Sequence, residues 1–168
     1  MTQFVLTSDK IVREASRLGA EYVGFIPVDE WEQKQDVPAE FFPVHIWPPA
    51  RQVIVLAVHF ELPGQITPDS AGWVQAQSRV TNELLDEIAY RLAVFINRSG
   101  YPSVNIPQDS SGENLADQPT AETFFHGWAG DYAGLGKISG QGILVGKDGQ
   151  RLNAVSVLTA FAETDARV

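Results

Sequence analysis

The chain has 168 residues, of which 44% are hydrophobic and 20% charged, so we expect residues 1–168 to form one globular domain. Its 21 acidic and 12 basic residues give a formal net charge of −9, which argues against nucleic-acid binding. Because the sequence has no cysteine, disulfides, catalytic thiolates and cysteine-ligated iron–sulfur clusters are excluded. We see neither a secretory signal nor an apolar run long enough to span a membrane, and therefore expect a cytoplasmic protein with no membrane partner.

The first third of the chain predicts a helix, a strand and a long loop. Thr7 or Ser8 can cap a helix that ends at Gly19. Residues 21–28 are typical of a strand. We expect a loop over residues 29–50, where prolines and aromatic residues are frequent.

The middle of the chain predicts a buried strand and a long helix. Residues 52–60 form a nearly continuous apolar run, typical of a strand that is buried on both faces. After a loop, apolar residues at every fourth position predict a helix over 73–99 that ends at Gly100. Residues 103–107 predict a short strand.

The last third predicts a helix and a hairpin. We expect a polar loop over 108–119, a helix over 121–131 and strands over 142–146 and 151–160. Asp148 and the glycine that follows it are typical of the turn between such strands. The predicted elements give an α+β domain of three layers, with a mixed β-sheet flanked by helices.

The stretch YAGLGKISGQGILVG (132–146) contains five glycines. Such a density predicts either a tight turn or a close approach of the backbone to another group. Phosphate-binding loops and dinucleotide fingerprints place their glycines between a strand and a helix. This stretch follows a helix and enters a strand, so it belongs to neither type.

Few other residues suggest chemistry. The three histidines show no spacing typical of metal ligands, so we predict no metal site. We expect His45 and His59 to be packed or hydrogen-bonded, whereas His126 is either packed or part of a site near the glycines. Lys137 can pair with an anionic group of a ligand or point into water. Carboxylates that can serve as acid or base, or solvate a loop, are Glu113, Asp117, Glu122 and Asp131.

The segment AGLGKISGQGILVGKDGQRLNAVSVLTA (133–160) resembles a block that marks the cobalamin-binding domain of epoxyqueuosine reductases. Reductive dehalogenases are more distant relatives of that family. Matching pieces occur in the same order at 18–31, 49–60 and 82–107, so the resemblance covers nearly the whole chain. It implies a nitroreductase-like fold in which the glycine-rich loop lies against a corrinoid.

The resemblance implies a set of cofactor-binding residues around the glycine-rich loop. They are His126, Gly134, Leu135, Gly136, Lys137, Ile138, Ser139, Gly140, Gln141 and Gly142.

The chain also departs from the family pattern. Ser139-Gly140-Gln141 replaces the usual glycine, basic residue and asparagine. The aspartate that donates a proton in epoxyqueuosine reductases aligns near Thr120, three positions from Asp117. No cysteine is present to hold the family's iron–sulfur clusters, so catalytic residues are not assigned.

Three functions therefore stay open at this point. The first is a stand-alone cobalamin-binding domain, acting as a carrier or as the cofactor subunit of a reductase that takes electrons from an external ferredoxin or flavoprotein. The second is an FMN-binding oxidoreductase of nitroreductase type, and the third is a non-catalytic structural or partner-binding domain. A homodimer is a further expectation.

Overall fold

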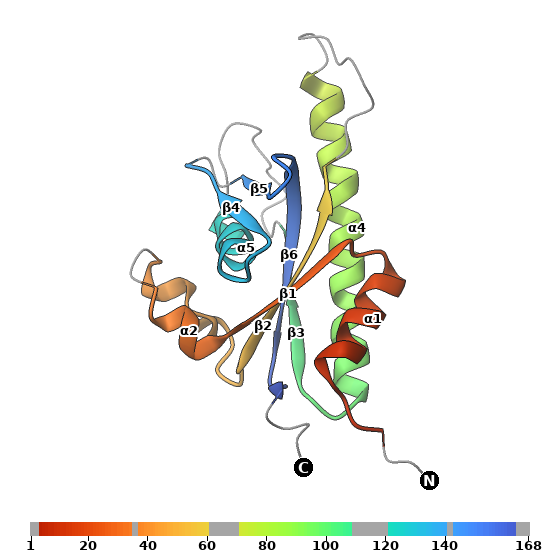
Figure 1. The fold of residues 1–168 in the computed structure, drawn as a ribbon, viewed down its shortest axis with the longest axis vertical. Helices are drawn as coiled ribbons and strands as arrows, with labels where there is room; N and C mark the ends of the chain where they lie inside the picture. The colour runs from red at the N-terminus through yellow and green to blue at the C-terminus, as the bar shows by residue number, and fades with distance from the viewer. Residues whose placement is uncertain (1–3, 35–36, 61–70, 109–120, 141–142, 164–168) are drawn as a thin grey trace.

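The computed structural model describes residues 4–34, 37–60, 71–108, 121–140 and 143–163, and its helices cover both faces of a β-sheet (Figure 1). The elements are α1 (Ser8–Leu18), β1 (Tyr22–Pro27), α2 (Val28–Glu32), a 3₁₀ turn (Ala39–Phe41), α3 (Pro43–Ile46), β2 (Gln52–His59), α4 (Ala71–Arg98), β3 (Ser103–Ile106), α5 (Ala121–Tyr132), β4 (Gly136–Ile138), β5 (Leu144–Gly146) and β6 (Arg151–Thr159). The predicted α+β class is confirmed.

The sheet has the strand order β1-β2-β6-β5-β4, and β3 also pairs with β6. Every strand pair in the described residues is antiparallel, so the predicted mixed sheet is wrong. The reason is that β4, β5 and β6 follow one another as hairpins, which reverse the chain direction. Strands β3 and β5 pair with different ends of β6, since β3 reaches Thr159 while β5 meets Arg151 and Leu152.

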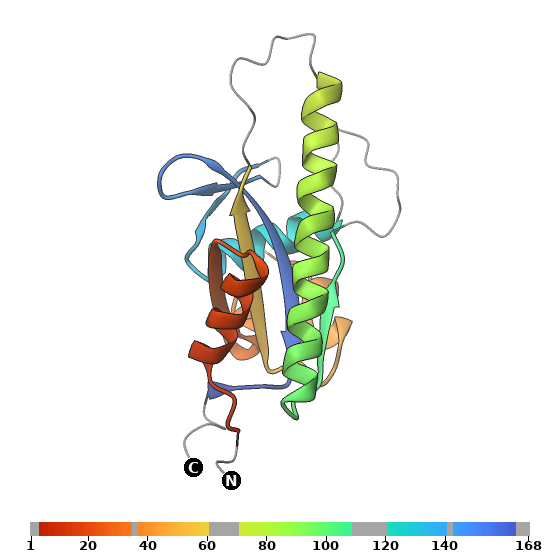
Figure 2. The same cartoon turned by 90° about the vertical axis from the view of Figure 1, so that its right-hand side faces the viewer.

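The middle of the sheet is buried on both faces, as its sequence predicts. Residues 53–57 of β2 are fully buried. On one face β2 and β6 pack against α1 and α4, and on the other face they pack against α2 and α5 (Figures 1 and 2). The three predicted layers are therefore present. In the described part of the chain, no helix is both long enough and apolar enough to cross a membrane.

The segment predicted as a loop over 29–50 contains two short helices and a 3₁₀ turn, so that part of the prediction is wrong. These helices have only four or five residues, too few to show an apolar period in the sequence. Trp31 of α2 is fully buried, and its ring centroid lies 5.0 Å from that of Phe125 in α5. This contact ties the segment to the core beneath α5.

Leu92 of α4 is fully buried in the core beneath α1, whereas Leu84 of the same helix is 47% exposed. We expect Leu92→Ala to lower the free energy of unfolding by about 2–5 kcal/mol, because it removes buried contacts and leaves a cavity. In dilute protein, Leu84→Ala should change the same quantity by less than about 1 kcal/mol. Urea denaturation of both variants measures the difference, and equal losses would contradict the assigned core.

Candidate functional site

The first glycine of the glycine-rich stretch ends helix α5. Gly134 has a φ of 81°, a left-handed conformation that glycine adopts without a steric cost. Its N–H donates to the Asp131 carbonyl at 3.0 Å, and the Leu135 N–H donates to the Gly130 carbonyl at 2.9 Å. These two bonds form a Schellman motif, in which a glycine stops a helix. Gly134 is therefore explained by local structure.

The second glycine of the stretch is required by the sheet. Gly136 begins β4 and lies opposite Gly146 of β5. A Cβ atom at Gly136 would lie 2.2 Å from the Val145 carbonyl oxygen, so no larger residue fits without moving the strand. Residues 136–138, for which the sequence predicted no strand, thus form β4, and the group that approaches the backbone here is the protein's own β5.

Asp131 fixes the start of the loop. Its Oδ2 accepts a hydrogen bond from the Ile138 N–H at 3.1 Å, and its Oδ1 lies 3.3 Å from the Lys137 Nζ. The Lys137 side chain is 87% exposed, so this ion pair is weak and leaves the ammonium group accessible to a ligand. Asp131, which the sequence offered as an acid or base, is engaged in holding β4.

The tip of the β4–β5 hairpin is open to solvent. The Ser139 N–H donates to the Ile143 carbonyl at 2.8 Å, which closes the hairpin. Ser139 and Gly140 are exposed, and a Cβ at Gly140 would meet nothing within 4 Å. The predicted site residues Gln141 and Gly142 lie outside the described residues.

His126 lies inside the protein. Its ring is 2% exposed, with Nε2 3.2 Å from the Pro107 carbonyl and Nδ1 2.9 Å from the Ser156 hydroxyl. A carbonyl only accepts hydrogen bonds, so Nε2 carries the proton and Nδ1 accepts from Ser156. This geometry favours the packing role that the sequence left open for His126.

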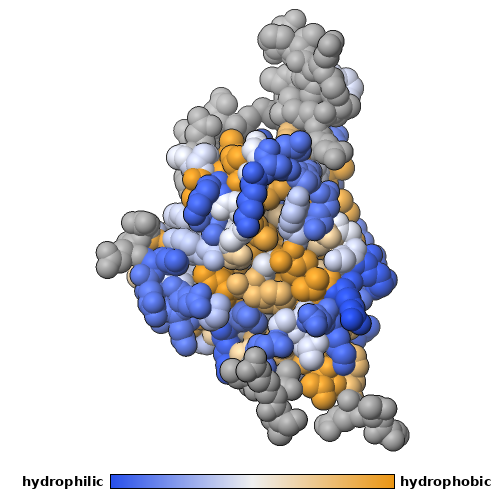
Figure 3. Space-filling view, in the orientation of Figure 1, coloured by the Kyte–Doolittle hydropathy of each residue, from blue (hydrophilic) through white to orange (hydrophobic). Residues whose placement is uncertain are grey.

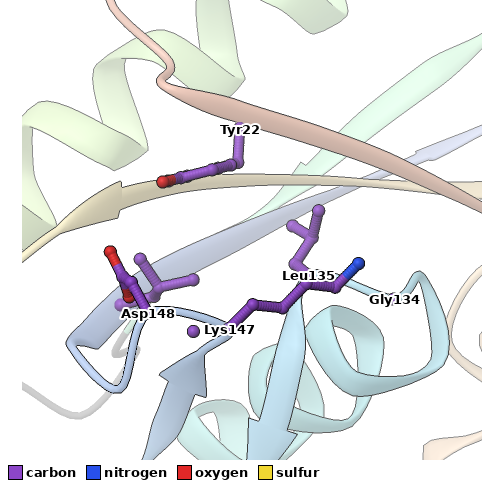
Figure 4. Close-up of a pocket in the computed structure, with 7 residues that line it drawn as sticks. Tyr22, Gly134, Leu135, Lys147 and Asp148 are labelled. Carbon is purple, nitrogen blue, oxygen red and sulfur yellow. The ribbon is translucent and has the colours of Figure 1, made fainter.

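A pocket of about 260 Å³ lies beside the end of α5, and Figure 4 draws the residues that line it. Among the predicted site residues that the structure describes, Gly134 and Leu135 line it. The sequence indicated the turn after β5 but gave no sign that this turn lies next to β1. The lining residues that sequence reasoning missed are Tyr22, Gly146, Lys147, Asp148 and Leu152.

His59 links three segments at one end of this pocket. Its Nδ1 lies 2.6 Å from Glu21, and its Nε2 lies 2.9 Å from Asp148 and 3.3 Å from the Tyr22 hydroxyl. In Figure 4 the Tyr22 hydroxyl and the Asp148 carboxylate lie at the same end of the pocket. The expected hydrogen-bonded role of His59 is confirmed.

The two carboxylates favour the protonated form of His59. The hydrogen bonds that the ring donates to Asp148 and then to Glu21 raise the pKa of His59 above its ordinary value. The pKa of Asp148 is lowered, first by the hydrogen bond from the Gln150 N–H and then by the bond to His59. The carboxylates bind opposite nitrogens of the ring, and no metal-ligand cluster occurs among the described residues.

Strand β1 carries apolar side chains on both faces of the sheet. Strand β1 lies at the edge of the sheet, and its Tyr22, Val23 and Phe25 are only partly buried. Figure 3 shows apolar atoms gathered at the centre of the face that β1 crosses in Figure 1. Of these residues only Tyr22 lines the pocket, whereas Val23 and Phe25 pack against the core beneath α1 on the opposite face of the sheet.

The remaining candidate residues do not line the pocket in the described part of the chain. Glu113, Asp117 and Thr120 lie outside the described residues, and the structure does not describe the Glu122 side chain. His45 is exposed at the end of α3, where its ring centroid lies 5.9 Å from that of Phe42. No acid or base is thus assigned from this set.

The cause of the glycine spacing can be tested by comparing two positions. We expect Gly136→Ala to destabilise the protein by about 1–3 kcal/mol, because the added methyl collides with the β5 backbone. Gly140→Ala is the matched control and should change stability by no more than about 1 kcal/mol, since the space around it is open. Chemical denaturation measures both, and a neutral Gly136→Ala would contradict the close β4–β5 pairing.

The His59 bridge predicts a pH-dependent stability. A histidine whose folded pKa is raised stabilises the fold fully below its unfolded pKa, about 6.5, and loses that contribution as pH rises through the folded pKa. The lowered pKa of Asp148 stabilises the fold above its ordinary 3.8 and is lost at more acidic pH. We expect the stability gap between wild type and His59→Gln to be largest between pH 3.8 and about 6.5, to shrink as pH rises through the folded pKa of His59, and to shrink below pH 3.8.

Thermal unfolding across that pH range checks the His59 bridge, and the NMR titration of the ring reports its pKa directly. His45→Gln removes an exposed histidine and is the control. A gap that widens above neutral pH would contradict the bridge.

The comparisons identify the fold. No protein-family model and no curated protein matches the chain. Among solved structures, the chain is similar to a reductive dehalogenase for which B12-dependent dehalogenation is described (20% identity, TM-score 0.56), and to a catabolic reductive dehalogenase (20%, 0.60). It is also similar to epoxyqueuosine reductase from Bacillus subtilis (13%, 0.58).

These similarities cover 91%, 90% and 92% of this chain but only 19%, 20% and 46% of the respective structures. The chain thus spans about a fifth of the dehalogenases and less than half of the epoxyqueuosine reductase. The predicted resemblance to these two groups is confirmed at the level of the fold, while the likeness to nitroreductases stays a prediction. The chain has the fold that reductive dehalogenases and epoxyqueuosine reductases share over one segment of their length.

Proposed function

We propose that this protein is a corrinoid-binding domain, acting as a carrier or as the cofactor subunit of a reductase. The observation that carries the proposal is the fold. About nine-tenths of this chain has the same fold as a segment of two groups of reductases. A B12-dependent reaction is described for one of the dehalogenases. The resemblance in sequence implies the same cofactor for epoxyqueuosine reductases.

The pocket beside α5 fits one part of such a ligand. Its volume of about 260 Å³ is below the ~300–1,000 Å³ of pockets that enclose whole drug-sized ligands. It can therefore take an edge or a side chain of a corrinoid. Tyr22, Leu135 and Leu152 supply apolar contacts, and the exposed Lys147 supplies a positive charge for the ligand's phosphate.

The hairpin tip offers a second set of contacts. Gly134 and Gly136 are accounted for by the helix end and the strand pairing, so among the described candidates backbone contact with a ligand falls to Ser139 and Gly140. His126, the one histidine in the set of cofactor-binding residues that the resemblance implies, is buried. Binding by the described candidates thus relies on apolar and backbone contacts rather than on a histidine.

A bound corrinoid supplies redox chemistry at cobalt, and the protein's part is to bind and orient it. A chain without cysteine holds no thiolate-ligated iron–sulfur cluster. The proposal therefore includes an external electron donor, a ferredoxin or a flavoprotein, wherever the domain serves a reductase.

The proposal predicts that the purified protein retains hydroxocobalamin after desalting, with a shifted absorption spectrum. Lys147→Glu and Gly140→Trp should each weaken retention by about tenfold or more, equivalent to ~1.4 kcal/mol, because they alter the pocket rim and the hairpin tip. Arg98→Glu, an exposed charge reversal at the end of α4, is the control and should bind as wild type does.

Retention of FMN instead of cobalamin would overturn the proposal in favour of a flavoprotein. Retention of neither ligand by a folded protein would overturn it as well. Cobalamin binding that neither variant affects would place the ligand elsewhere on the chain and contradict the proposed site.

A further inference from the structure

Helix α4 carries several large apolar side chains that are exposed. Trp73, Val80, Leu84 and Tyr90 are 77%, 59%, 47% and 60% exposed. The N-terminal part of this helix extends past the end of the sheet (Figures 1 and 2). Single exposed apolar residues are ordinary on a protein surface, but several on one helix indicate a contact surface.

Three of these residues follow the spacing of a coiled coil. Positions that alternate by four and three residues keep their side chains on one face of a helix. We call the set of such positions along this helix the α4 stripe. The stripe consists of Trp73, Gln77, Val80, Leu84, Glu87 and Arg91. Tyr90 flanks it.

The α4 stripe is separate from the face of α4 that packs on the sheet. Leu85 and Leu92 are fully buried in the core beneath α1, whereas Leu84 is exposed. Successive residues of an α-helix lie about 100° apart around the axis. The α4 stripe is therefore turned away from the core by roughly that angle, which leaves it open to a second helix.

We propose that the α4 stripe is a homodimer surface, on which α4 of a second copy packs antiparallel. The α4 stripe is complementary to itself when the chain runs the other way. In an arrangement centred on Asn82, Val80 lies opposite Leu84 of the partner subunit, and Leu84 lies opposite Val80 of the partner subunit. An isologous two-fold interface has this reciprocity. The apolar residues thus meet at the centre of the interface.

The polar ends of the α4 stripe also match in this register. Trp73 lies opposite Arg91 of the partner subunit, and Gln77 lies opposite Glu87 of the partner subunit. An indole face attracts a guanidinium group, and an amide N–H donates to a carboxylate. Glu87 and Arg91 form an ion pair of 2.7 Å on the surface, with side chains 58% and 61% exposed, so both are accessible to a partner.

The parallel arrangement lacks this complementarity. It would place Glu87 against Glu87 of the partner subunit and Arg91 against Arg91 of the partner subunit, and like charges face to face disfavour association. Electrostatic repulsion opposes the antiparallel dimer, because each copy carries a net charge of −9. We therefore expect a weak dimer whose population rises with protein concentration.

The experiment uses two variants that each disrupt the apolar centre of the dimer. Each variant alone should not associate, whereas the two together should. Val80→Lys and Leu84→Glu replace exposed residues, so both chains should keep the fold, which circular dichroism verifies. Sedimentation velocity over a micromolar-to-millimolar series should show a wild-type dimer and a tenfold or greater loss of self-association in each variant. Arg79→Glu, an exposed position on another face of α4, should associate as wild type does.

An equimolar mixture of the two variants should dimerise again. In the antiparallel register Lys at position 80 of one chain meets Glu at position 84 of the other, while the remaining Leu84 meets the remaining Val80. A wild-type chain that stays monomeric throughout the series would overturn the proposal, leaving the α4 stripe to another partner. Variants that still dimerise would also overturn it, and a mixture that stays monomeric would overturn the antiparallel register.

Discussion

The antiparallel pairing of β2 with β6 is the interaction on which the rest of this structure depends. Eight residue pairs join the two strands, from Gln52 opposite Thr159 to His59 opposite Leu152. Both faces are covered by helices, and the apolar residues of each strand are buried there. Water is thus excluded from the backbone hydrogen bonds at the centre, while apolar burial on two sides provides the main driving force for folding.

The central pair also determines where the pocket beside α5 forms. Strand β6 pairs with β5 at its start and with β3 near its end, so the turn between β5 and β6 projects past the edge of the central pair. His59 at the end of β2 then bonds to Asp148 in that turn and to Glu21 beside β1. The bonds that His59 makes to Tyr22 and Asp148 hold together two of the residues that line the pocket.

The sequence predicted the central strands and long helices well because their signals are local. The apolar run of β2 and the four-residue period of α4 are properties of neighbouring residues, and the structure has both elements close to the predicted bounds. The short helices between β1 and β2 were missed because their stability comes from tertiary contacts, such as the burial of Trp31 against Phe125. The sequence of a strand also does not show whether its neighbours in the sheet run parallel or antiparallel to it, so the antiparallel pairing was not predicted.

The candidate site was only partly predictable for a related reason. The density of glycines indicated close backbone contacts, but a sequence does not distinguish contact with a ligand from contact with another strand. Gly136 meets the Val145 carbonyl and Gly134 ends a helix, so two of the five glycines are explained internally. The pocket residue Tyr22 is far from the glycines in sequence. Lys147 is close to them, but it lies in a turn whose position depends on the pairing of β5 with β6.

The proposed ligand surface and the proposed dimer surface lie on different layers of the domain. Helix α5 and the pocket belong to one face of the sheet, whereas α4 covers the other. A second copy bound along the α4 stripe therefore leaves the pocket open to a ligand. Energetic coupling between two sites requires an element with two arrangements that both sites bias. The central pair β2–β6 lies between the layers and is packed on both faces, so we expect binding at one surface to leave the other unchanged.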